Sequence, residues 1–265
     1  MSPSEGDGAR GHLPRLSIVI PTLNEAENLP RLLRRLTDPQ RPAADRADEV
    51  VVSDGGSSDG TLALVEEAAT AAAAGARGNA AQATLQLVSG ATGRGAQLAR
   101  GAQLAQGDLL LFLHADCIPG PGALANLRAA FLDPALCAAA MSQRIAAPGL
   151  FYRWVERAAD ARSRRGRVMG DSGLAVRREA YRAAGGFRPL PLFEDLDLSR
   201  RLRGQGRVTL VGSAVLEVSP RRWQREGPLR CTFRNWMLRV LFSWGVDPHR
   251  LHRMYQPHSP RADHH

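Results

Sequence analysis

Four polar segments hold most of the residues that could carry chemistry, and each directly follows an apolar stretch. They cover residues 21–25, 54–60, 90–95 and 114–116. Their carboxylates could hold a divalent cation or accept a proton, and their glycines would let a ligand approach the backbone. Turn and capping chemistry explains any one segment taken alone, since Asn, Ser and Asp are common in such loops. The four together predict a ligand site, provided that the fold gathers them.

The apolar stretches before these segments predict strands over residues 16–20, 50–52, 85–88 and 108–113. Leucines at helical spacing predict a helix over 25–36, and Ala-rich stretches predict helices over 62–74 and 96–105. Strands that alternate with helices indicate an α/β fold with a mostly parallel sheet and helices on both faces. Ligands bind beyond the carboxyl ends of the strands in such a sheet. We therefore expect the four polar segments to meet at this edge.

The second half of the chain is less regular. It predicts strands over 137–141, 208–211 and 214–218, helices over 151–165, 178–184, 196–203 and 229–244, and a loop that runs into a short strand over 170–177. We find no internal repeat and no long linker. The simplest interpretation is a flexible tail over 1–14, one α/β domain over 15–220, and a C-terminal helix with a polar tail over 221–265.

Composition narrows the class of protein. All 35 basic residues other than histidine are arginine, and with 26 acidic residues they give a formal net charge of +9. Such a balance attracts phosphates of any kind, but it extends over the whole chain, so charge alone predicts no partner. The three cysteines are too scattered for a disulfide framework. No stretch resembles a signal peptide or the roughly 20 apolar residues of a spanning helix, so we expect a cytoplasmic protein.

Two common nucleotide-binding motifs are absent. A chain without lysine cannot contain G-x-x-x-x-G-K-[ST], and the first strand leads into PTLNE rather than G-x-G-x-x-G. Gly93-Arg94-Gly95 does not complete that fingerprint, because the next glycine is Gly101. These observations argue against a P-loop NTPase and against an NAD-dependent enzyme.

Five motifs resemble, in order, those of family 2 glycosyltransferases. They are SIVIPTLNEAENL, VVSDGGSSDGT, LLLFLHADC, GDSGLAVRREAYRAAGGF and FEDLDLSRRLRGQG, and they run from about Leu16 to Val218. The resemblance implies a single Rossmann-like domain of the GT-A type, with a nucleotide-binding half over about 15–118 and an acceptor half over about 119–220. It also implies an enzyme that moves a sugar from a nucleotide-diphospho-sugar. The segment after residue 220 resembles a bacterial subgroup whose acceptor is unknown.

The same resemblance assigns the donor and acceptor sites. The residues implied to contact the nucleotide sugar are Pro21, Thr22, Glu25, Asp54, Arg94, His114 and Asp116. His114-Ala115-Asp116 stands at the D-x-D position, which holds Mn²⁺ or Mg²⁺ on the diphosphate. Asp116 is the expected metal ligand there, whereas His114 replaces the first acid and its part in metal binding is open. The residues implied to border the acceptor are Gly170, Asp171, Ser172 and Gly173.

Glu194-Asp195 stands at the acidic pair that supplies the catalytic base in the family. Neighbouring residues rarely face the same site, so we favour Asp195 as the base of an inverting single displacement, with Glu194 orienting it. Without the resemblance, both would be interpreted as acids that stabilise the first turn of a helix. No histidine follows the last strand, where many such folds place a further metal ligand. Arg221 or Arg222 is expected to contact the diphosphate instead, and a solvated basic loop is the alternative.

The expected partners are a UDP- or GDP-sugar donor and an unidentified acceptor. Apolar residues at helical spacing over 229–244, with arginines nearby, allow peripheral contact with the inner membrane surface, a homodimer, or packing on the domain core. Two other functions stay in view. A nucleotidyltransferase would need a glycine-rich basic signature after the first strand, which is absent. The hypothesis of a basic module that binds nucleic acid or a membrane surface is supported only by the charge and the final helix. Of these two partners, nucleic acid is the less expected.

Overall fold

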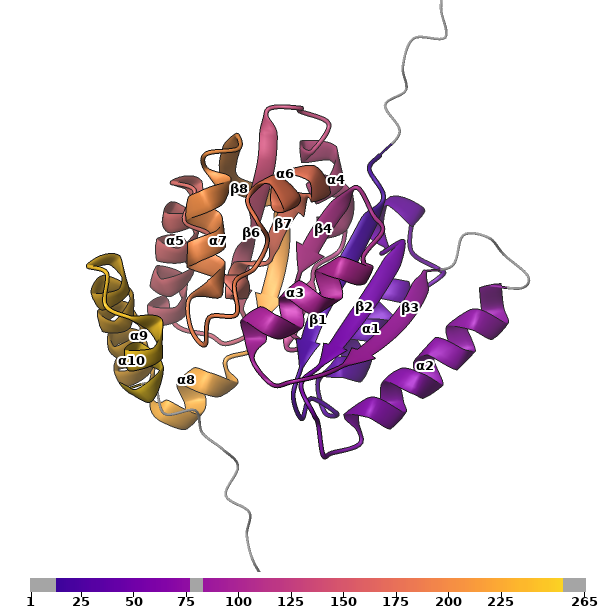
Figure 1. Ribbon diagram of the computed structural model, residues 1–265, viewed down its shortest axis with the longest axis horizontal. Helices are drawn as coiled ribbons and strands as arrows, with labels where there is room; N and C mark the ends of the chain where they lie inside the picture. Colours follow the sequence, from indigo (N-terminus) through magenta and orange to yellow (C-terminus); the bar gives the residue numbers. More distant parts are fainter. Residues whose placement is uncertain (1–12, 77–82, 255–265) are drawn as a thin grey trace, which may run out of the picture.

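The computed structural model describes residues 13–76 and 83–254. Eight strands form one sheet in the order β3-β2-β1-β4-β7-β6-β8-β5 (Figure 1). The strands are β1 (Leu16–Thr22), β2 (Glu49–Asp54), β3 (Thr84–Ser89), β4 (Leu109–Phe112), β5 (Cys117–Pro119), β6 (Leu136–Ile145), β7 (Leu174–Arg177) and β8 (Arg207–Val218). Strands β3, β2, β1 and β4 pair in parallel, as do β6 and β8, whereas β7 and β5 pair antiparallel with their neighbours.

Helices cover both faces of the sheet, as predicted (Figure 1). One face packs against α1 (Leu29–Thr37), α2 (Thr61–Ala76) and α4 (Ala123–Ala130), and the other against α3 (Arg94–Leu104), α6 (Arg178–Ala183) and α7 (Glu194–Leu202). Because successive side chains of a strand point to opposite faces, Ile18 and Ile20 join the first core, and Val19 joins the second. Both faces of the central strands are therefore buried, which explains their uninterrupted apolar sequence.

Several boundaries differ from the sequence prediction. The helix expected from residue 25 begins at Leu29, because residues 25–28 form a turn in which the Asn28 N–H donates to the Glu25 carbonyl. The strands expected over 208–211 and 214–218 are one strand, β8, which changes register against β6 between Met141 and Ser142. Strand β5 and helix α4 were not predicted, since a three-residue strand and an Ala-rich helix leave little periodic signal.

The remaining helices come from the second half of the sequence. Helix α5 (Leu150–Arg164) packs on β6, and the C-terminal segment folds into α8 (Arg221–Glu226), α9 (Pro228–Ser243) and α10 (Pro248–Met254). The single helix expected over 229–244 is thus the middle one of three. No helix within the described residues has the length and apolar character needed to cross a membrane.

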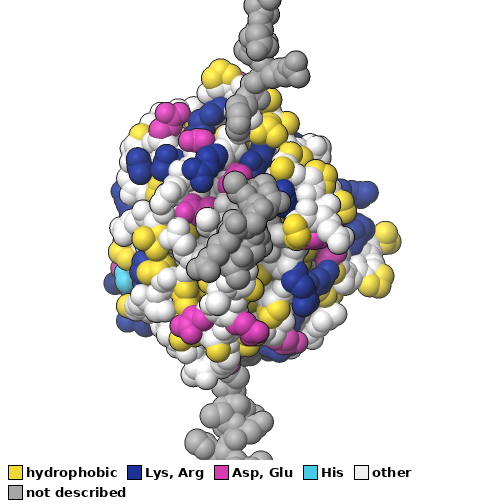
Figure 2. All heavy atoms as spheres, turned by 90° about the vertical axis from the view of Figure 1, so that its right-hand side faces the viewer, with side chains coloured by type: hydrophobic (Ala, Val, Ile, Leu, Met, Phe, Trp, Pro, Cys, Tyr) yellow, Lys and Arg dark blue, Asp and Glu magenta, His cyan; other side chains and the backbone are white. Residues whose placement is uncertain are grey.

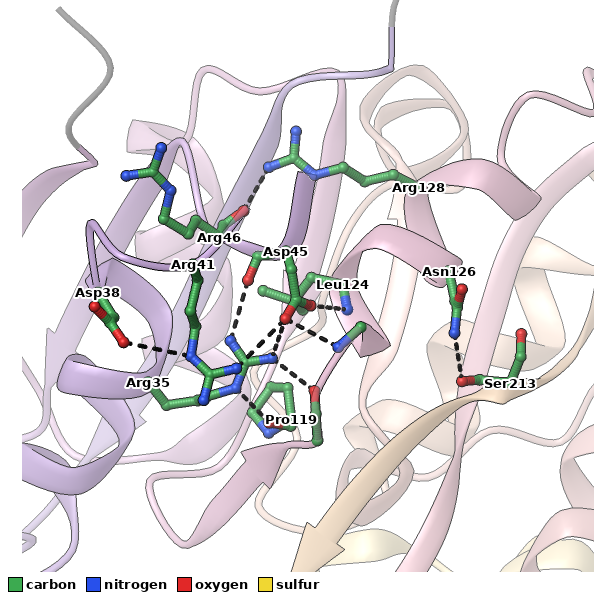
Figure 3. A network of polar contacts seen from close by, with 12 residues as sticks. Arg35, Asp38, Arg41, Asp45, Arg46, Pro119, Leu124, Asn126, Arg128 and Ser213 are labelled. Carbon is green, nitrogen blue, oxygen red and sulfur yellow. Dashed lines mark hydrogen bonds and ion pairs between the residues drawn. The ribbon is translucent and has the colours of Figure 1, made fainter. Parts of the chain in front are cut away.

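A buried ion pair helps to fasten the end of β5 and the residue that follows it to helix α1 (Figure 3). The guanidinium of Arg35, only 7% exposed, donates to the carbonyls of Pro119 and Gly120 and lies 2.9 Å from the Asp45 carboxylate. Asp45 in turn accepts from the backbone N–H of Leu124 at the start of α4. Because β5 and α4 are both held, the preceding residues 114–116 leave β4 in a defined direction.

Charges of both signs are interspersed on the face at the α2 edge of the molecule (Figure 2). Ion pairs join exposed Arg31 to Glu217 and exposed Arg207 to Asp133, and buried Arg128 pairs with Asp48. Several arginines therefore pair with carboxylates of the same chain and do not gather into one basic surface patch.

Candidate active site

Asp54 ends β2 and organises the loop that follows it. Its buried carboxylate accepts from the Thr22 hydroxyl at 3.0 Å and from the backbone N–H groups of Gly56 and Ser57, each at 2.8 Å. Burial would raise the pKa of Asp54, but the hydrogen bonds from Ser57, Gly56 and Thr22 outweigh it and lower the pKa. An ionised carboxylate thus holds the ends of β1 and β2 together at the rim of the sheet.

The loop after β1 is joined to the loop after β2 by reciprocal hydrogen bonds. Asn24 adopts a left-handed conformation with φ of +55°, its N–H donates to the Ser57 hydroxyl, and its side-chain oxygen accepts from the Ser58 N–H at 2.8 Å. The Glu25 N–H donates to the Thr61 hydroxyl at the start of α2. These contacts leave the Glu25 carboxylate at the rim, where burial raises its pKa.

Arg221 brings the C-terminal segment to the same rim. One of its Nη atoms lies 3.8 Å from Glu25 Oε1 and 3.9 Å from Asp116 Oδ2. A single guanidinium therefore lies between the loop after β1 and the loop after β4, although 105 residues separate Asp116 from it in sequence. Arg222 is exposed on α8 on the side of α9, where burial raises the pKa of the Cys231 thiol and the charge of Arg222 partly opposes that shift.

His114 and Asp195 meet at Gly170. The Gly170 N–H donates to Asp195 Oδ2 at 2.6 Å, and a Cβ on Gly170 would lie 2.6 Å from His114 Nε2 and 3.3 Å from Asp195 Oδ2. Pro21 near the end of β1 helps these residues line a small cavity of about 10 Å³. The end of β1, the residue His114 after β4, the turn at Gly170 and the start of α7 therefore converge on one point.

The carboxyl group of Asp195 is buried, and its pKa lies above the usual value for aspartate. Burial, followed by the negative charge of Glu194, raises the pKa of Asp195 to about 6, although Arg94 and the N–H groups of Gly170 and Leu196 oppose this. Burial and the charge of Arg94 lower the pKa of His114, which favours a neutral imidazole. A carboxylate that titrates near neutral pH is well suited to accept a proton during a reaction.

Glu194 does not line the small cavity that Asp195 lines. It is buried and forms an ion pair with Arg94 at the start of α3, while its Oε2 has no hydrogen-bond partner among the described residues. The preceding residue, Phe193, has a left-handed backbone with φ of +63° and packs on Phe242 of α9, ring centroids 5.0 Å apart. A left-handed backbone at a bulky residue is strained, and it occurs here directly before the acidic pair.

Most of the residues that the sequence singles out are thus gathered at one rim. They are Pro21, Thr22, Glu25, Asp54, Arg94, His114, Asp116, Gly170, Glu194, Asp195 and Arg221. Asp171 lies beside the rim, 3.8 Å from Arg162 of α5. Ser172 and Gly173 are buried behind it, where a Cβ on Gly173 would meet Leu113 at 3.2 Å, and their place beside the acceptor stays a prediction.

The sequence analysis did not predict two residues that contribute to the site. Gln97 of α3 donates from one amide nitrogen to the carbonyls of Thr22 and Ser53 and so ties the ends of β1 and β2 together. Arg239 of α9 reaches the neighbourhood of Asp171, where the two charges act on each other. Neither residue belongs to a motif, and an arginine in an arginine-rich helix carries no signal of its own.

Comparison with protein families decides the assignment. The model of glycosyl transferase family 2 matches residues 17–183, more than half of the chain. This chain belongs to glycosyltransferase family 2. The predicted family and enzyme class are confirmed. The match ends at residue 183, before α7, so the residues that complete the rim from α7 and α8 lie beyond the matched segment.

Related proteins agree with this assignment. The chain is 33% identical to the glycosyltransferase AglE of Haloferax volcanii over 109 aligned residues. The aligned residues make up 40% of this chain and 32% of AglE. The mannosyltransferase PcManGT of Pyrobaculum calidifontis, solved with GDP-Man and Mn²⁺, superposes with a TM-score of 0.61 at 22% identity, over 78% of this chain and 57% of that one. TarS 1–349 of S. aureus with UDP-GlcNAc gives a TM-score of 0.53 at 18% identity, over 77% and 58%.

The two solved structures confirm the predicted GT-A fold. The family 2 glycosyltransferase described here spans about a third of AglE and under two thirds of each of these two structures.

Proposed function

We propose that this family 2 glycosyltransferase moves a glycosyl group from a nucleotide-diphospho-sugar to an acceptor hydroxyl by inverting single displacement. The observation that carries the proposal is Asp195, a buried carboxyl with a pKa of about 6 that lies against Gly170 beside His114. A base at the point where the donor and acceptor halves of the rim meet is what such a displacement requires.

The reaction balances with Asp195 as the proton acceptor. The acceptor oxygen attacks C1 of the sugar, a new C1–O bond forms, and the bond from C1 to the diphosphate oxygen breaks. The nucleoside diphosphate leaves with the electron pair, and the hydroxyl proton passes to Asp195. Attack from the side opposite the leaving group inverts the configuration at C1, as in other single displacements.

The rim over β1 and β2 is suited to the nucleotide. Asp54, Thr22 and Glu25 lie within two loops that hydrogen bonds fix relative to each other, so a base and ribose would meet a preformed surface. PcManGT was solved with GDP-Man and TarS with UDP-GlcNAc. We therefore propose a UDP- or GDP-sugar as the donor.

Asp116 and His114 are suited to a divalent cation such as Mn²⁺ or Mg²⁺. The Asp116 carboxylate is partly exposed, with Arg221 at 3.9 Å, and His114 is held neutral and keeps a nitrogen lone pair. No group of three or more metal-binding side chains occurs in the described part of the chain, so diphosphate oxygens and water would complete the coordination. When bound, the cation neutralises charge on the leaving diphosphate.

Arg221 contributes positive charge to the same leaving group. Its guanidinium lies between Glu25 and Asp116, and it can bind phosphate oxygens with two N–H groups. The positive charge of this contact would take over part of the work of a metal ion held by a further ligand. We propose the contact for Arg221 rather than for the more exposed Arg222.

Donor binding and turnover test the proposal. A panel of UDP- and GDP-sugars, with and without Mn²⁺, should raise the melting temperature for one donor class, because a ligand stabilises the folded state that it binds. Asp195→Asn should lower donor hydrolysis by about 10²- to 10⁴-fold without loss of nucleotide binding, whereas Asp116→Ala should weaken the response to Mn²⁺. Turnover equal to the parent in both variants, or release of pyrophosphate as in a nucleotidyltransferase, would contradict it.

A further inference from the structure

A deep groove lies between α5 and the C-terminal helices, next to the proposed catalytic base. Its volume is about 560 Å³, in the range of pockets that take small organic ligands. Figure 1 shows α9 running alongside α5, and the walls of the groove come from both helices and from α8. Helices α8 and α9 lie beyond the residues that match the family model, whereas α5 lies within them.

The walls of the groove are aromatic. The rings that line it are Phe151 and Trp154 from α5, Trp223 from α8, and Phe233 and Trp236 from α9. Trp154 is 60% exposed and Trp236 is 53% exposed, although large aromatic side chains are usually buried. Exposed aromatic side chains gathered around one concave surface are typical of a binding site rather than of a solvated face.

The inner end of the groove is polar and carries an excess of positive charge. Asp171, Arg162 and Arg239 line it together, so two guanidiniums face one carboxylate. Arg162 lies 3.8 Å from Asp171, and its Nε has no hydrogen-bond partner among the described residues. Burial and the charge of Arg162 lower the pKa of Arg239, and Asp171 opposes this. A second anion at this end would relieve the repulsion between the two guanidiniums.

The polar end lies beside the loop residue that holds the proposed base. Met169 and Asp171, the two chain neighbours of Gly170, both line the groove, while Gly170 itself donates its N–H to Asp195. Asp195 lines the small neighbouring cavity rather than the groove. A molecule whose anionic group reached Arg162 and Arg239 would therefore place the neighbouring part of its structure next to the loop that carries the Asp195 contact.

We propose that the groove is the acceptor subsite, and that the acceptor is a small anionic amphiphile with a flat apolar body. Its acidic group pairs with Arg162 and Arg239, its apolar body lies between the Trp154 and Trp236 walls, and its hydroxyl reaches Asp195. This inference rests on the proposed function, because only a glycosyltransferase needs an acceptor there. The volume of the groove favours a small molecule over a long lipid chain or a protein segment.

Binding of 1-naphthyl phosphate tests the chemistry of the groove. This probe combines a flat apolar body with a phosphate, whereas 1-naphthol lacks the anion and inorganic phosphate lacks the apolar part. Isothermal titration of the full chain should show at least tenfold tighter binding of 1-naphthyl phosphate than of either comparator. Equal or weaker binding of the combined probe would overturn the proposal.

Matched variants locate the binding. Arg239→Met and Trp236→Ala should each weaken 1-naphthyl phosphate at least tenfold. Arg230→Met and Trp244→Ala change exposed residues of the same helical segment that do not line the groove, and they should leave the affinity unchanged. Trp236 is half exposed, so its variant should fold, and circular dichroism would check this. Equal affinities in all four variants would place the probe elsewhere and overturn the proposal.

Two further measurements separate the competing occupants and the two proposals. If Trp236→Ala abolished sedimentation with phosphatidylglycerol vesicles, or a dimer seen by light scattering, while the parent failed to bind 1-naphthyl phosphate, the groove would be a docking surface and the inference wrong. Donor hydrolysis by the parent is measured in parallel. Hydrolysis without probe binding contradicts the inference alone, whereas probe binding without any nucleotide-sugar binding contradicts the proposed function.

Discussion

The meeting of His114 and Asp195 depends on a single residue without a side chain, Gly170. Its backbone N–H holds one oxygen of Asp195, and its Cα leaves room for the imidazole of His114. The sequence suggested that this glycine borders the acceptor, but the contacts give it a more specific place between base and imidazole. A glycine here is required by space rather than by its backbone angle.

Gly170→Ala should disturb this contact. The added Cβ would lie 2.6 Å from His114 Nε2 and 3.3 Å from Asp195 Oδ2, so one of the two side chains must move. We expect donor hydrolysis to fall by about 10- to 100-fold, since small displacements of a reacting group are costly. Gly212→Ala, where nothing lies within 4 Å of the new Cβ, serves as the control. Similar rates for both variants would argue against this role.

The pKa of Asp195 predicts how turnover depends on pH. A base must be ionised to accept a proton, and the pKa of about 6 means that Asp195 becomes protonated as the pH falls through that value. We expect kcat/KM for donor hydrolysis to be level above this pKa and to fall about tenfold per pH unit below it. Asp195→Asn should flatten this limb of the profile. An unchanged limb in the variant would assign the titration to another group.

At the scale of elements, α9 supports the turn that presents the acidic pair. Buried Phe193, Leu238 and Leu251 form a cluster joined by Met169, which precedes Gly170, and by Leu196, which follows Asp195. Helix α9 therefore packs against the chain neighbours of both Gly170 and Asp195. A left-handed backbone at a bulky residue costs about 1–3 kcal/mol, and packing of Phe193 on α9 offsets it.

Phe242→Ala should therefore affect the site from a distance. Its ring lies 5.0 Å from that of Phe193, centroid to centroid, so the variant loses the contact that holds the left-handed turn. We expect a loss of about 1–3 kcal/mol in unfolding free energy and a drop in kcat, with donor affinity nearly unchanged. Trp244→Ala, at a side chain that is 78% exposed, should change neither. An unaltered kcat in folded Phe242→Ala would show that the turn holds without α9.

At the scale of the whole molecule, the two halves are joined by polar contacts as well as by the sheet. Arg35 and Asp45 belong to the nucleotide half, and their partners Gly120 and Leu124 belong to the acceptor half (Figure 3). The partners Gly120 and Leu124 follow Asp116 by a few residues and lie on the other side of β5 from it in sequence. Its integrity should therefore matter for stability more than for any single catalytic contact.

Arg35→Leu should destabilise the whole fold. Removing the guanidinium leaves the buried Asp45 carboxylate with Arg41, 3.6 Å away, as its remaining counter-ion. Loss of one partner of a buried ion pair costs about 3–5 kcal/mol in comparable cases, and we expect a value toward the lower end of that range. The neighbouring Arg34 is exposed on the same helix, so Arg34→Leu should change the unfolding free energy by less than about 0.5 kcal/mol. Urea denaturation followed by circular dichroism measures both, and equal values for the two variants would contradict the prediction.

The C-terminal helix illustrates what a pattern can and cannot decide. Its apolar spacing allowed a membrane contact, a dimer or packing on the core, and the structure divides these side chains among several environments. Leu238 is buried against Phe193, Phe233 and Trp236 line the groove, and Trp244 is exposed. Peripheral membrane contact and dimerisation through this helix stay predictions.

The sequence by itself determined the order of the elements in the nucleotide half, the family and most of the rim. These follow from local chemistry: apolar runs predict buried strands, turn residues end them, and parallel strands present their carboxyl ends at one edge. Asp54, Asp116 and Asp195 could be selected because each stands in a motif, beside a strand end or helix start.

Only the tertiary structure decided how those residues act on one another. Asp195, but not Glu194, lines the small cavity beside His114, the burial of Arg35 depends on Asp45, and the aromatic groove needs α5 opposite α9. Each of these depends on contacts between segments far apart in the chain, and the free energy of such contacts has no signature in local spacing. A pKa of about 6 at Asp195 has the same origin, because burial causes most of it.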